Sequence, residues 1–216
     1  MDLSPGMKTA VIVSGGDPVP PDVLEDLPDD PWVVAADGGA DHAADLGLAV
    51  DVLIGDLDSV SRDVVSSIDE ERIIGHPTDK DATDLELAFE LVAAADDVDR
   101  VVLVGGTGGR LDHFLANAML ICAPRFAHLD LVWIAPPARA TVVRDHVRLH
   151  GSVGDKVSLI PIGGDAVGVT TTGLRWPLAG DDLRIGSTRG VSNEFSTAVS
   201  TIAIESGVLL VVQPEG

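Results

Sequence analysis

The stretch Arg100-Val101-Val102-Leu103-Val104-Gly105-Gly106-Thr107-Gly108-Gly109-Arg110-Leu111-Asp112-His113 passes from a continuous apolar run through a glycine-rich loop into a helical pattern that extends to residue 121. A short apolar run that ends in glycines is typical of a buried β-strand. Its apolar residues are consecutive and do not alternate with polar ones, so we expect both faces of the strand to be covered, as in a parallel sheet between helices. The stretch therefore predicts an α/β fold.

The same order of strand, Gly/Asp-rich junction and helix recurs along the first part of the chain. Helical periodicity is clearest over residues 83–95, where Leu85, Ala88, Phe89 and Val92 form one stripe. Further apolar runs occupy residues 9–13, 32–36, 52–54, 72–75 and 129–134. Because ligands of such sheets bind beyond the carboxyl ends of the strands, we expect the polar junctions to form the functional site.

The pattern changes after Pro136-Pro137, where short β-like runs replace the helices. Turn signals such as Gly154-Asp155 and Gly180-Asp181 recur every 8 to 12 residues or so, which favours a small sandwich or barrel. The runs occupy residues 140–144, 147–149, 156–161, 167–172, 200–205 and 208–212. We expect a mostly parallel α/β/α sandwich over residues 1–136, followed by a smaller all-β sandwich over residues 137–216.

The composition is strongly acidic, with 35 Asp and Glu residues against 14 Lys and Arg residues and a formal charge of −21. Such a surface repels nucleic acid and anionic membranes, so we expect neither as a partner. No apolar run of about 18 residues is present and the first residues do not resemble a signal peptide, which predicts a cytoplasmic protein without a membrane span. The single cysteine, Cys122, predicts a buried free thiol and no internal disulfide.

Asp56 and Asp58 follow the apolar run at residues 52–54 and are two positions apart. In an extended chain, positions i and i+2 point to the same face, so the two carboxylates would converge and repel unless a cation lies between them. Magnesium is commonly held by one or two carboxylates together with substrate phosphates. The segment Gly55-Asp56-Leu57-Asp58-Ser59 is equally consistent with a simple turn.

The chain just before the second clear helix is rich in charge. Thr83 and Glu86 fit a capping box, and Asp81 and Asp84 fit a cap and a first-turn acid, which is a purely structural alternative. Lys80 favours a functional interpretation, because a lysine at a strand-to-helix junction suits phosphate oxygens.

The glycine loop after the strand at residues 100–104 indicates an anion site. Glycines allow backbone amides to approach a phosphate, the helix N-terminus favours negative charge, and Arg110 would add a charge-assisted contact. The pattern is neither a P-loop nor a dinucleotide fingerprint. His113 is either a base or a structural helix residue. In the similar junction Asp37-Gly38-Gly39-Ala40, Asp37 either contacts a ligand or caps the helix.

Six motifs together resemble those of the thiamine pyrophosphokinase family, in its order and at its usual spacings. They are Ala36-Asp37-Gly38-Gly39-Ala40, Gly55-Asp56-Leu57-Asp58-Ser59, Lys80-Asp81-x-Thr83-Asp84, Gly109-Arg110-x-Asp112-His113, Thr171-Thr172-Gly173-Leu174-x-Trp176 and Ser192-Asn193-Glu194. The resemblance implies an ATP–magnesium domain over residues 1–136, a thiamine-binding sandwich over residues 137–216, and a homodimer with active sites between subunits. The implied reaction moves a pyrophosphoryl group from ATP to the hydroxyethyl oxygen of thiamine, giving thiamine diphosphate and AMP.

The resemblance also implies roles for single residues. Asp56, Asp58 and Asp84 resemble the family's magnesium ligands. Trp176 resembles the aromatic residue that stacks on the thiamine pyrimidine, although by itself it is equally consistent with the sandwich core. The implied catalytic residues are Asp37, Lys80, Asp81 and Arg110, and either Asp81 or Asp37 would take the hydroxyl proton. The residues expected to bind the substrates are Gly15, Gly38, Thr83, Gly106, Gly109, Asp112, His113, Thr171, Thr172, Trp176, Ser192 and Asn193.

Two other functions remain open from the sequence. One is a diphosphokinase for another heteroaromatic alcohol, such as a hydroxymethyl pterin, although the Thr-Thr-Gly-Leu-x-Trp stretch favours thiamine. The other is a thiamine- or nucleotide-binding module without catalysis, which would be expected to lack carboxylates of the metal site; all three are present.

Overall fold

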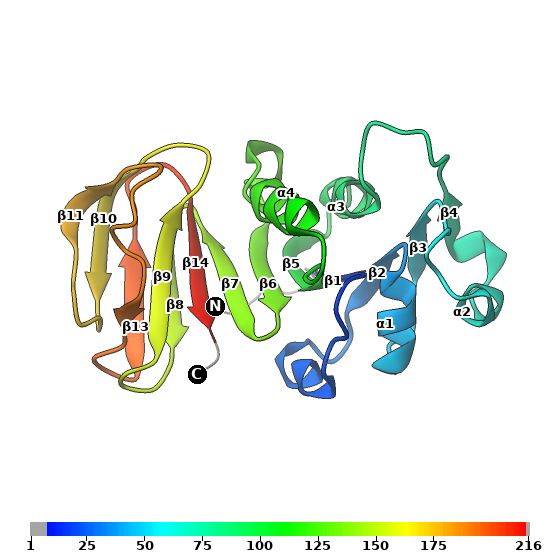
Figure 1. The fold of residues 1–216 in the computed structure, drawn as a ribbon, viewed down its shortest axis with the longest axis horizontal. Helices are drawn as coiled ribbons and strands as arrows, with labels where there is room; N and C mark the ends of the chain where they lie inside the picture. The colour runs from blue at the N-terminus through cyan, green and yellow to red at the C-terminus, as the bar shows by residue number, and fades with distance from the viewer. Residues whose placement is uncertain (1–7, 215–216) are drawn as a thin grey trace. The chain divides into compact units, whose positions relative to one another are not determined.

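The computed structural model describes residues 8–214 and divides the chain into two compact units (Figure 1). The first unit contains the described residues up to Asn117 together with His128–Pro136. The second contains Ala118–Ala127 and the residues from Pro137 onward. Among residues 8–214, no helix is long and apolar enough to cross a membrane.

A six-stranded parallel sheet forms the centre of the first unit. The strands are ordered β6-β5-β1-β2-β3-β4, and all neighbouring pairs are parallel. The chain therefore adds strands on one side of β1 and then crosses to its other side with β5, which makes the carboxyl ends of β1 and β5 a topological switch point. The strands are β1 (Lys8–Ser14), β2 (Trp32–Ala36), β3 (Val52–Gly55), β4 (Ile73–Gly75), β5 (Val98–Gly105) and β6 (Asp130–Ala135).

Helices cover both faces of this sheet, as the continuous apolar strands predict. Ala10–Val13 of β1 are completely buried, although successive side chains point to opposite faces. Val11 and Val13 pack with Ala43 of the helix α1, whereas α3 lies on the other side of the sheet in Figure 1. The helix α3 buries the stripe that its periodicity predicts. The helices are α1 (Gly39–Asp45), α2 (Arg62–Ser67), α3 (Asp84–Ala93) and α4 (Leu111–Ile121), with 3₁₀ turns η1 (Pro21–Asp26), η2 (Glu70–Arg72) and η3 (Pro124–Phe126).

The second unit is an antiparallel β structure of two layers. One layer has the order β12-β9-β14-β7 and the other has the order β11-β10-β13-β8. Inward residues of both layers, among them Leu159, Val169, Ile202 and Leu209, share one buried core with Phe195. The strands are β7 (Ala138–Val143), β8 (His146–His150), β9 (Lys156–Pro161), β10 (Ala166–Thr172), β11 (Ala179–Leu183), β12 (Asn193–Glu194), β13 (Val199–Ala203) and β14 (Leu209–Pro214). The expected fold class, a mostly parallel α/β structure followed by a smaller all-β sandwich, is confirmed.

One sequence interpretation in this unit is wrong. Gly180-Asp181 is not a turn but belongs to the edge strand β11, in which only Leu183 is buried. An edge strand with a single inward apolar side chain has no alternation from which to be predicted. The buried thiol of Cys122 is confirmed, and burial raises its pKa to about 11.

Candidate active site

A cavity of about 650 Å³ lies in the first unit, beyond the carboxyl ends of β1, β2 and β5. The junction after each of these strands lines it, as the position of a topological switch point predicts. The start of α3 contributes Thr83, Asp84 and Leu85, and α4 contributes His113 and Asn117. The strand junctions contribute Ser14, Gly15, Gly16, Asp17, Ala36, Asp37, Gly38, Gly106, Thr107, Gly108, Gly109 and Arg110.

The glycine loops around this cavity are tightly packed against one another. The amide of Gly106 donates to the carbonyl of Gly15 (3.0 Å), and the amide of Asp17 donates to the carbonyl of Thr107 (2.8 Å). A Cβ atom on Gly16 would lie 2.0 Å from the Thr107 carbonyl oxygen, so only glycine permits this approach. The loops after β1 and β5 therefore form one rigid wall on which backbone can face a phosphate.

Two buried side chains brace this wall from behind. The indole Nε1 of Trp133 donates to the carbonyl of Gly105 (2.7 Å), and Nδ2 of Asn117 donates to the carbonyl of Gly106 (3.0 Å). Both glycines have positive φ, at +80° and +71°, which is the conformation that glycine adopts without strain. Asn117 was missed from the sequence; an amide inside an apolar helical stripe was the available signal.

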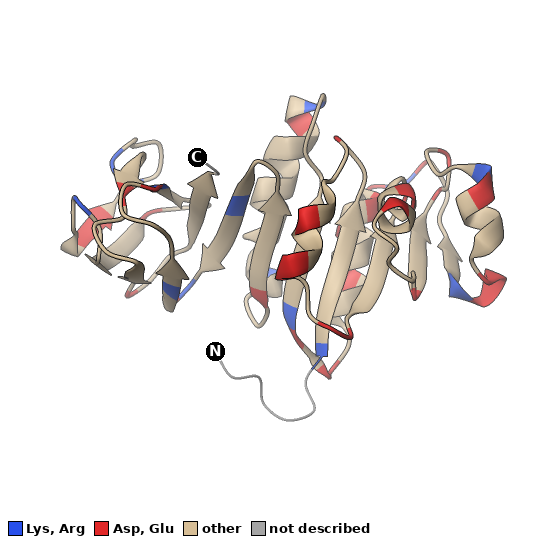
Figure 2. Cartoon of the chain, turned by 90° about the horizontal axis from the view of Figure 1, so that it is seen from below, with Lys and Arg blue, Asp and Glu red and all other residues tan. Residues whose placement is uncertain are grey.

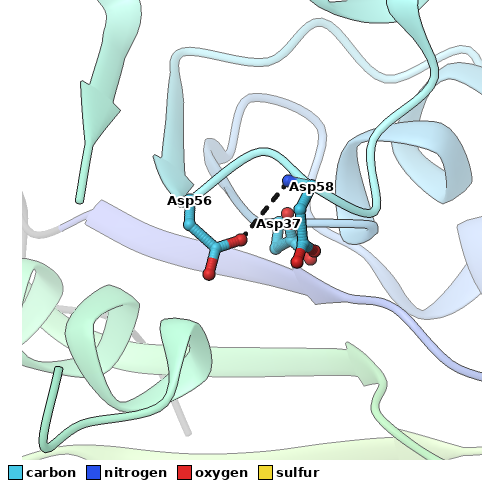
Figure 3. A group of neighbouring side chains, drawn as sticks. All are labelled: Asp37, Asp56 and Asp58. Carbon is cyan, nitrogen blue, oxygen red and sulfur yellow. Dashed lines mark hydrogen bonds between the residues drawn. The ribbon is translucent and has the colours of Figure 1, made fainter. Parts of the chain in front are cut away.

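Three aspartates gather at the carboxyl ends of β2 and β3 (Figure 3). Asp37, Asp56 and Asp58 each offer a carboxylate oxygen, and these three oxygens lie within 4.8 Å of one another. Asp56 and Asp58 converge through a turn, because Leu57 has φ of +63° and the amide of Asp58 donates to Asp56 Oδ1 (3.3 Å). The expectation of an extended chain here is wrong, while the turn alternative is correct and still brings the carboxylates together.

Asp84 and Lys80 adjoin this cluster. The ammonium of Lys80 lies 3.2 Å from Asp56 Oδ2 and 2.9 Å from Asp84 Oδ1, and its side chain is only 13% exposed. Gly55 lets the carboxylates approach, because a Cβ atom there would lie 3.1 Å from both Asp37 Cβ and Asp84 Oδ1. The lysine therefore occupies a cation position between two of the carboxylates that resemble magnesium ligands.

The electrostatics of the cluster favour a bound cation. Burial, together with the charges of Asp84 and Asp56, raises the pKa of Asp37, although hydrogen bonds from Gly38 and Ser59 oppose this effect. Backbone hydrogen bonding from Asp58, with Lys80, holds the pKa of Asp56 below its ordinary value. Oδ1 of Asp37 is buried and accepts no hydrogen bond from residues 8–214. An oxygen-only donor set with an unsatisfied carboxylate oxygen fits magnesium well.

The helix-capping alternatives are now decided. Thr83 is the N-cap of α3, and its Oγ1 accepts from the amide of Glu86 (3.2 Å). The N-cap of α1 is Gly38, with no side-chain hydrogen bond, so Asp37 is not a cap. Asp81 is exposed and does not line the cavity.

Arg110 and Asp112 form an exposed bidentate ion pair at the rim. Nε and Nη2 of Arg110 donate to the two carboxylate oxygens of Asp112 at 3.0 and 2.7 Å. This pairing holds the pKa of Asp112 far below its ordinary value. Arg110 lines the cavity and Asp112 does not, so a phosphate at Arg110 would compete with Asp112 for the guanidinium.

Asp41 and His42 also line the cavity, although neither belongs to a motif recognised in the sequence. Nδ1 of His42 lies 3.1 Å from the carbonyl oxygen of Ser14, and Oδ2 of Asp41 accepts from the amide of Ser61 (3.0 Å). Ser59 also lines the cavity and hydrogen-bonds Asp37. Their positions depend on how α1 and the loop after β3 pack, which residue type alone does not predict.

The predicted thiamine-binding residues lie in the second unit. Trp176 is 52% exposed, so the interpretation of this residue as sandwich core is wrong. The hydroxyl of Thr171 is buried and accepts from the amide of Leu178 (2.9 Å), and the hydroxyl of Thr172 lies 2.6 Å from that of Thr201. Ser192 has φ of +58° and immediately precedes the buried Asn193.

Two family models match the chain. The model described as "Thiamin pyrophosphokinase, catalytic domain" matches residues 25–133, and "Thiamin pyrophosphokinase, vitamin B1 binding domain" matches residues 146–209. Thiamine pyrophosphokinase of Bacillus subtilis is 28% identical over 221 residues, covering 96% of this chain and 99% of its own. Thiamine pyrophosphokinase 2 of Arabidopsis thaliana is 28% identical over 171 residues, covering 74% of this chain and 63% of its own.

Solved structures show the same similarity. The crystal structure of the Bacillus subtilis thiamine pyrophosphokinase superposes with a TM-score of 0.84 at 25% identity, covering 97% of this chain and 100% of the other. That of thiamin pyrophosphokinase from Geobacillus thermodenitrificans gives a TM-score of 0.79 at 26% identity, covering 96% and 98%.

Proposed function

The chain belongs to the thiamine pyrophosphokinase family, and on this premise we propose that it transfers the pyrophosphoryl group of ATP to the hydroxyethyl oxygen of thiamine, releasing AMP. The observation that carries the proposal is a cluster of four aspartates and one lysine beside a glycine-walled cavity at a switch point, which two of the aspartates, Asp37 and Asp84, line. The match of residues 146–209 to a vitamin B1 binding model favours thiamine over a pterin as the acceptor.

We assign ATP and magnesium to the domain of residues 1–136 and thiamine to that of residues 137–216. As the resemblance to the family implies, Asp56, Asp58 and Asp84 would hold magnesium, and Lys80 already places a positive charge between Asp56 and Asp84. Asp37, whose carboxylate clusters with those of Asp56 and Asp58, would lie beside the ion. A bound magnesium ion would neutralise phosphate charge and make the β-phosphorus more electrophilic. The glycine wall would face the phosphate chain with its backbone, and Arg110 and Lys80 would donate to phosphate oxygens.

Asp37 is the residue that we propose to accept the hydroxyl proton. It lines the cavity, whereas Asp81, the other candidate, is exposed and outside it. Burial raises the pKa of Asp37, which brings its proton affinity closer to what a general base needs near neutral pH. Phosphoryl transfer depends mainly on positioning and charge stabilisation, so this base is expected to contribute less than the metal ligands.

The remaining assignments follow from the family and the charge. Thiamine is a cation, and the net charge of −21, visible as acidic residues spread over helices and loops in Figure 2, favours its approach. We propose a cytoplasmic homodimer with active sites between subunits. In support of an interface, α4 exposes Leu111, Leu115 and Met119 at four-residue intervals on one face.

The reaction is tested by incubating the protein with thiamine, ATP and magnesium and separating the products. Thiamine diphosphate and AMP are expected, and formation of ADP, or turnover that does not depend on thiamine, would refute the proposal. Asp58→Asn is expected to lower kcat at least about 100-fold, with the exposed Asp29→Asn as a matched control.

The division of roles among the carboxylates has its own test. Calorimetric magnesium titration in the presence of ATP should show loss of binding in Asp84→Asn and retention in Asp37→Asn, although both variants lose turnover. The opposite result would place Asp37 in the metal shell and remove Asp84 from it.

A further inference from the structure

Trp176 is a half-exposed aromatic residue that is held in place at both of its backbone polar groups. Oδ1 of Asn193 accepts from the amide of Trp176 (3.1 Å), and Nδ2 of Asn193 donates to its carbonyl oxygen (2.8 Å). Asn193 is itself 5% exposed, and its Oδ1 also accepts from the amide of Glu194 (2.8 Å). Pro177 further restricts the backbone of the tryptophan that precedes it. The ring is therefore presented to solvent on a fixed backbone.

One face of this ring is already covered. The guanidinium carbon of Arg175 lies 4.8 Å from the ring centroid of Trp176, which is within the range of a cation–π contact. The guanidinium is mostly exposed, and such a side chain is free to leave the ring unless another group holds it. A planar ligand could stack only on the face that Arg175 leaves open.

Glu194 is the group that holds Arg175. Its Oε2 accepts from Nη1 of Arg175 (2.7 Å), and its carbonyl oxygen accepts from the amide of Arg175 (2.8 Å). Its other carboxylate oxygen pairs with the ammonium of Lys156. The Glu194 side chain is largely buried, and Lys156 and Arg175 hold its pKa below the ordinary value, so it is ionised at neutral pH.

We propose that Glu194 is a positioning and specificity residue for the acceptor, which through Arg175 fixes the open face of Trp176 and neutralises the charge behind it. The inference rests on the proposed function, in which thiamine stacks on Trp176. Thiamine is a cation, so an unneutralised guanidinium one ring thickness away would oppose its binding. With Glu194 in place, the charge of Arg175 is neutralised, so Arg175 covers one face of the Trp176 ring without repelling thiamine. The open face of Trp176 is then already fixed before the ligand binds.

The test uses full-length protein and measures thiamine binding and the KM values of both substrates. Glu194→Gln and Arg175→Gln are each expected to weaken thiamine binding about three- to tenfold, with the KM for ATP within about twofold of wild type. Asp181→Asn is the matched control, because Asp181 makes a comparable ion pair with Arg189 in the same unit and is not part of the hydrogen-bonded group of Arg175, Asn193 and Glu194 that surrounds Trp176. That variant should bind thiamine as the wild type does.

A double variant separates action through Arg175 from a general structural effect. If Glu194 acts through Arg175, Glu194→Gln has no further effect once Arg175→Gln is present, so the two losses do not multiply. Losses that multiply, or a rise in the KM for ATP as large as that for thiamine, would overturn the inference. Arg175 is exposed, so its variant is expected to fold even if Glu194→Gln does not.

Tryptophan fluorescence supplies a signature that needs no ligand. Trp32 is half-buried and is replaced by phenylalanine for this measurement. The other remaining tryptophan, Trp133, is buried, so acrylamide quenching then reports mainly on Trp176 and should increase in Glu194→Gln as the covered face opens. Unchanged quenching would show that Glu194 does not hold Arg175 over the ring. Wild-type protein that binds no thiamine would refute the proposed function, whereas wild-type binding with an unaffected Glu194→Gln would refute only this inference.

Discussion

The contact between α1 and β1 makes a strong prediction for two adjacent glycines. A Cβ atom on Gly39 would lie 2.0 Å from the carbonyl oxygen of Val13, whereas a Cβ atom on Gly38 would find nothing closer than 3.6 Å. Side-chain carbons essentially never approach other atoms closer than 3.0 Å, so Gly39→Ala must separate helix and strand by about 1 Å. The obstructing atom is backbone and has no rotamer through which to move away.

The size of the effect follows from this overlap. Overpacking against a rigid neighbour costs about 1–3 kcal/mol, and the depth of this overlap places Gly39→Ala at about 3 kcal/mol. At about 2–4 °C per kcal/mol for a chain of this length, the melting temperature should fall by about 6–12 °C. Gly38→Ala puts a poorer residue at the N-cap and should cost less than about 1 kcal/mol. Asp37 lies two residues before Gly39, just ahead of the N-cap of α1, so Gly39→Ala should also displace Asp37 and lower kcat by on the order of 100-fold.

Scanning calorimetry and the thiamine diphosphate assay measure the two consequences on the same preparations. Gly38→Ala is the matched control for the melting temperature, since it adds the same methyl group one position earlier; Gly38 itself lines the cavity, so turnover of this variant is compared only with that of Gly39→Ala. Equal melting temperatures and equal turnover for the two variants would show that α1 does not pack closely on β1, and that this contact does not position Asp37.

Three further predictions concern the cavity and the aspartate cluster beside it. In metal-free protein, Asp37→Asn should have a higher melting temperature than wild type at pH 7. The pKa of the Asp37 carboxyl is raised on folding, so the wild-type protein loses stability as the pH rises through that pKa. The difference in melting temperature should shrink as the pH falls toward 3.8, and a difference that does not change with pH would contradict this prediction. Magnesium should raise the melting temperature of Lys80→Met by more than it raises that of the wild type. Lys8→Met, which removes an exposed ion pair, should respond to magnesium as the wild type does. Equal magnesium-induced shifts in the wild type and both variants would contradict this prediction. Asn117→Leu leaves the Gly106 carbonyl without its donor, so it should lower the free energy of unfolding measured in denaturant by about 1–3 kcal/mol. It should also raise the KM for ATP but not the KM for thiamine. An unchanged KM for ATP would show that the Asn117–Gly106 hydrogen bond does not position the ATP site.

The fold was predictable where burial is continuous and not where it is sparse. Consecutive apolar residues in β1, β2 and β5 are buried on both faces, so they indicate strands without any alternation. The short helices α1 and α2 have too few turns to show a period, and β12 has only two residues. Such elements are defined by the surrounding packing, which a local pattern does not contain.

The candidate site divides in the same way. Glycine and aspartate junctions at strand ends were informative, because a parallel sheet brings these ends to one edge whatever the loops do. Asp17, His42 and Asn117 line the cavity through loop closure and helix orientation, and their residue types are common in purely structural positions. The convergence of Asp56 and Asp58 was predicted with the wrong backbone, since either an extended strand or a left-handed turn can bring the two carboxylates together.

Backbone strain occurs at motif residues in both units of the chain. Among residues 8–214, the non-glycine residues with positive φ are Asp37, Leu57 and Ser192, and all three lie in motif segments. A left-handed conformation costs an L-residue about 1–2 kcal/mol, so it persists where surrounding contacts impose it. At Leu57 the reversal lets the Asp58 amide reach the Asp56 carboxylate, and at Ser192 it comes directly before Asn193, which fixes Trp176. In both places a hydrogen bond offsets the backbone strain beside a residue with a proposed role in substrate binding, Asp58 in the first unit and Trp176 in the second. This arrangement is expected where the exact position of a side chain matters more than local stability.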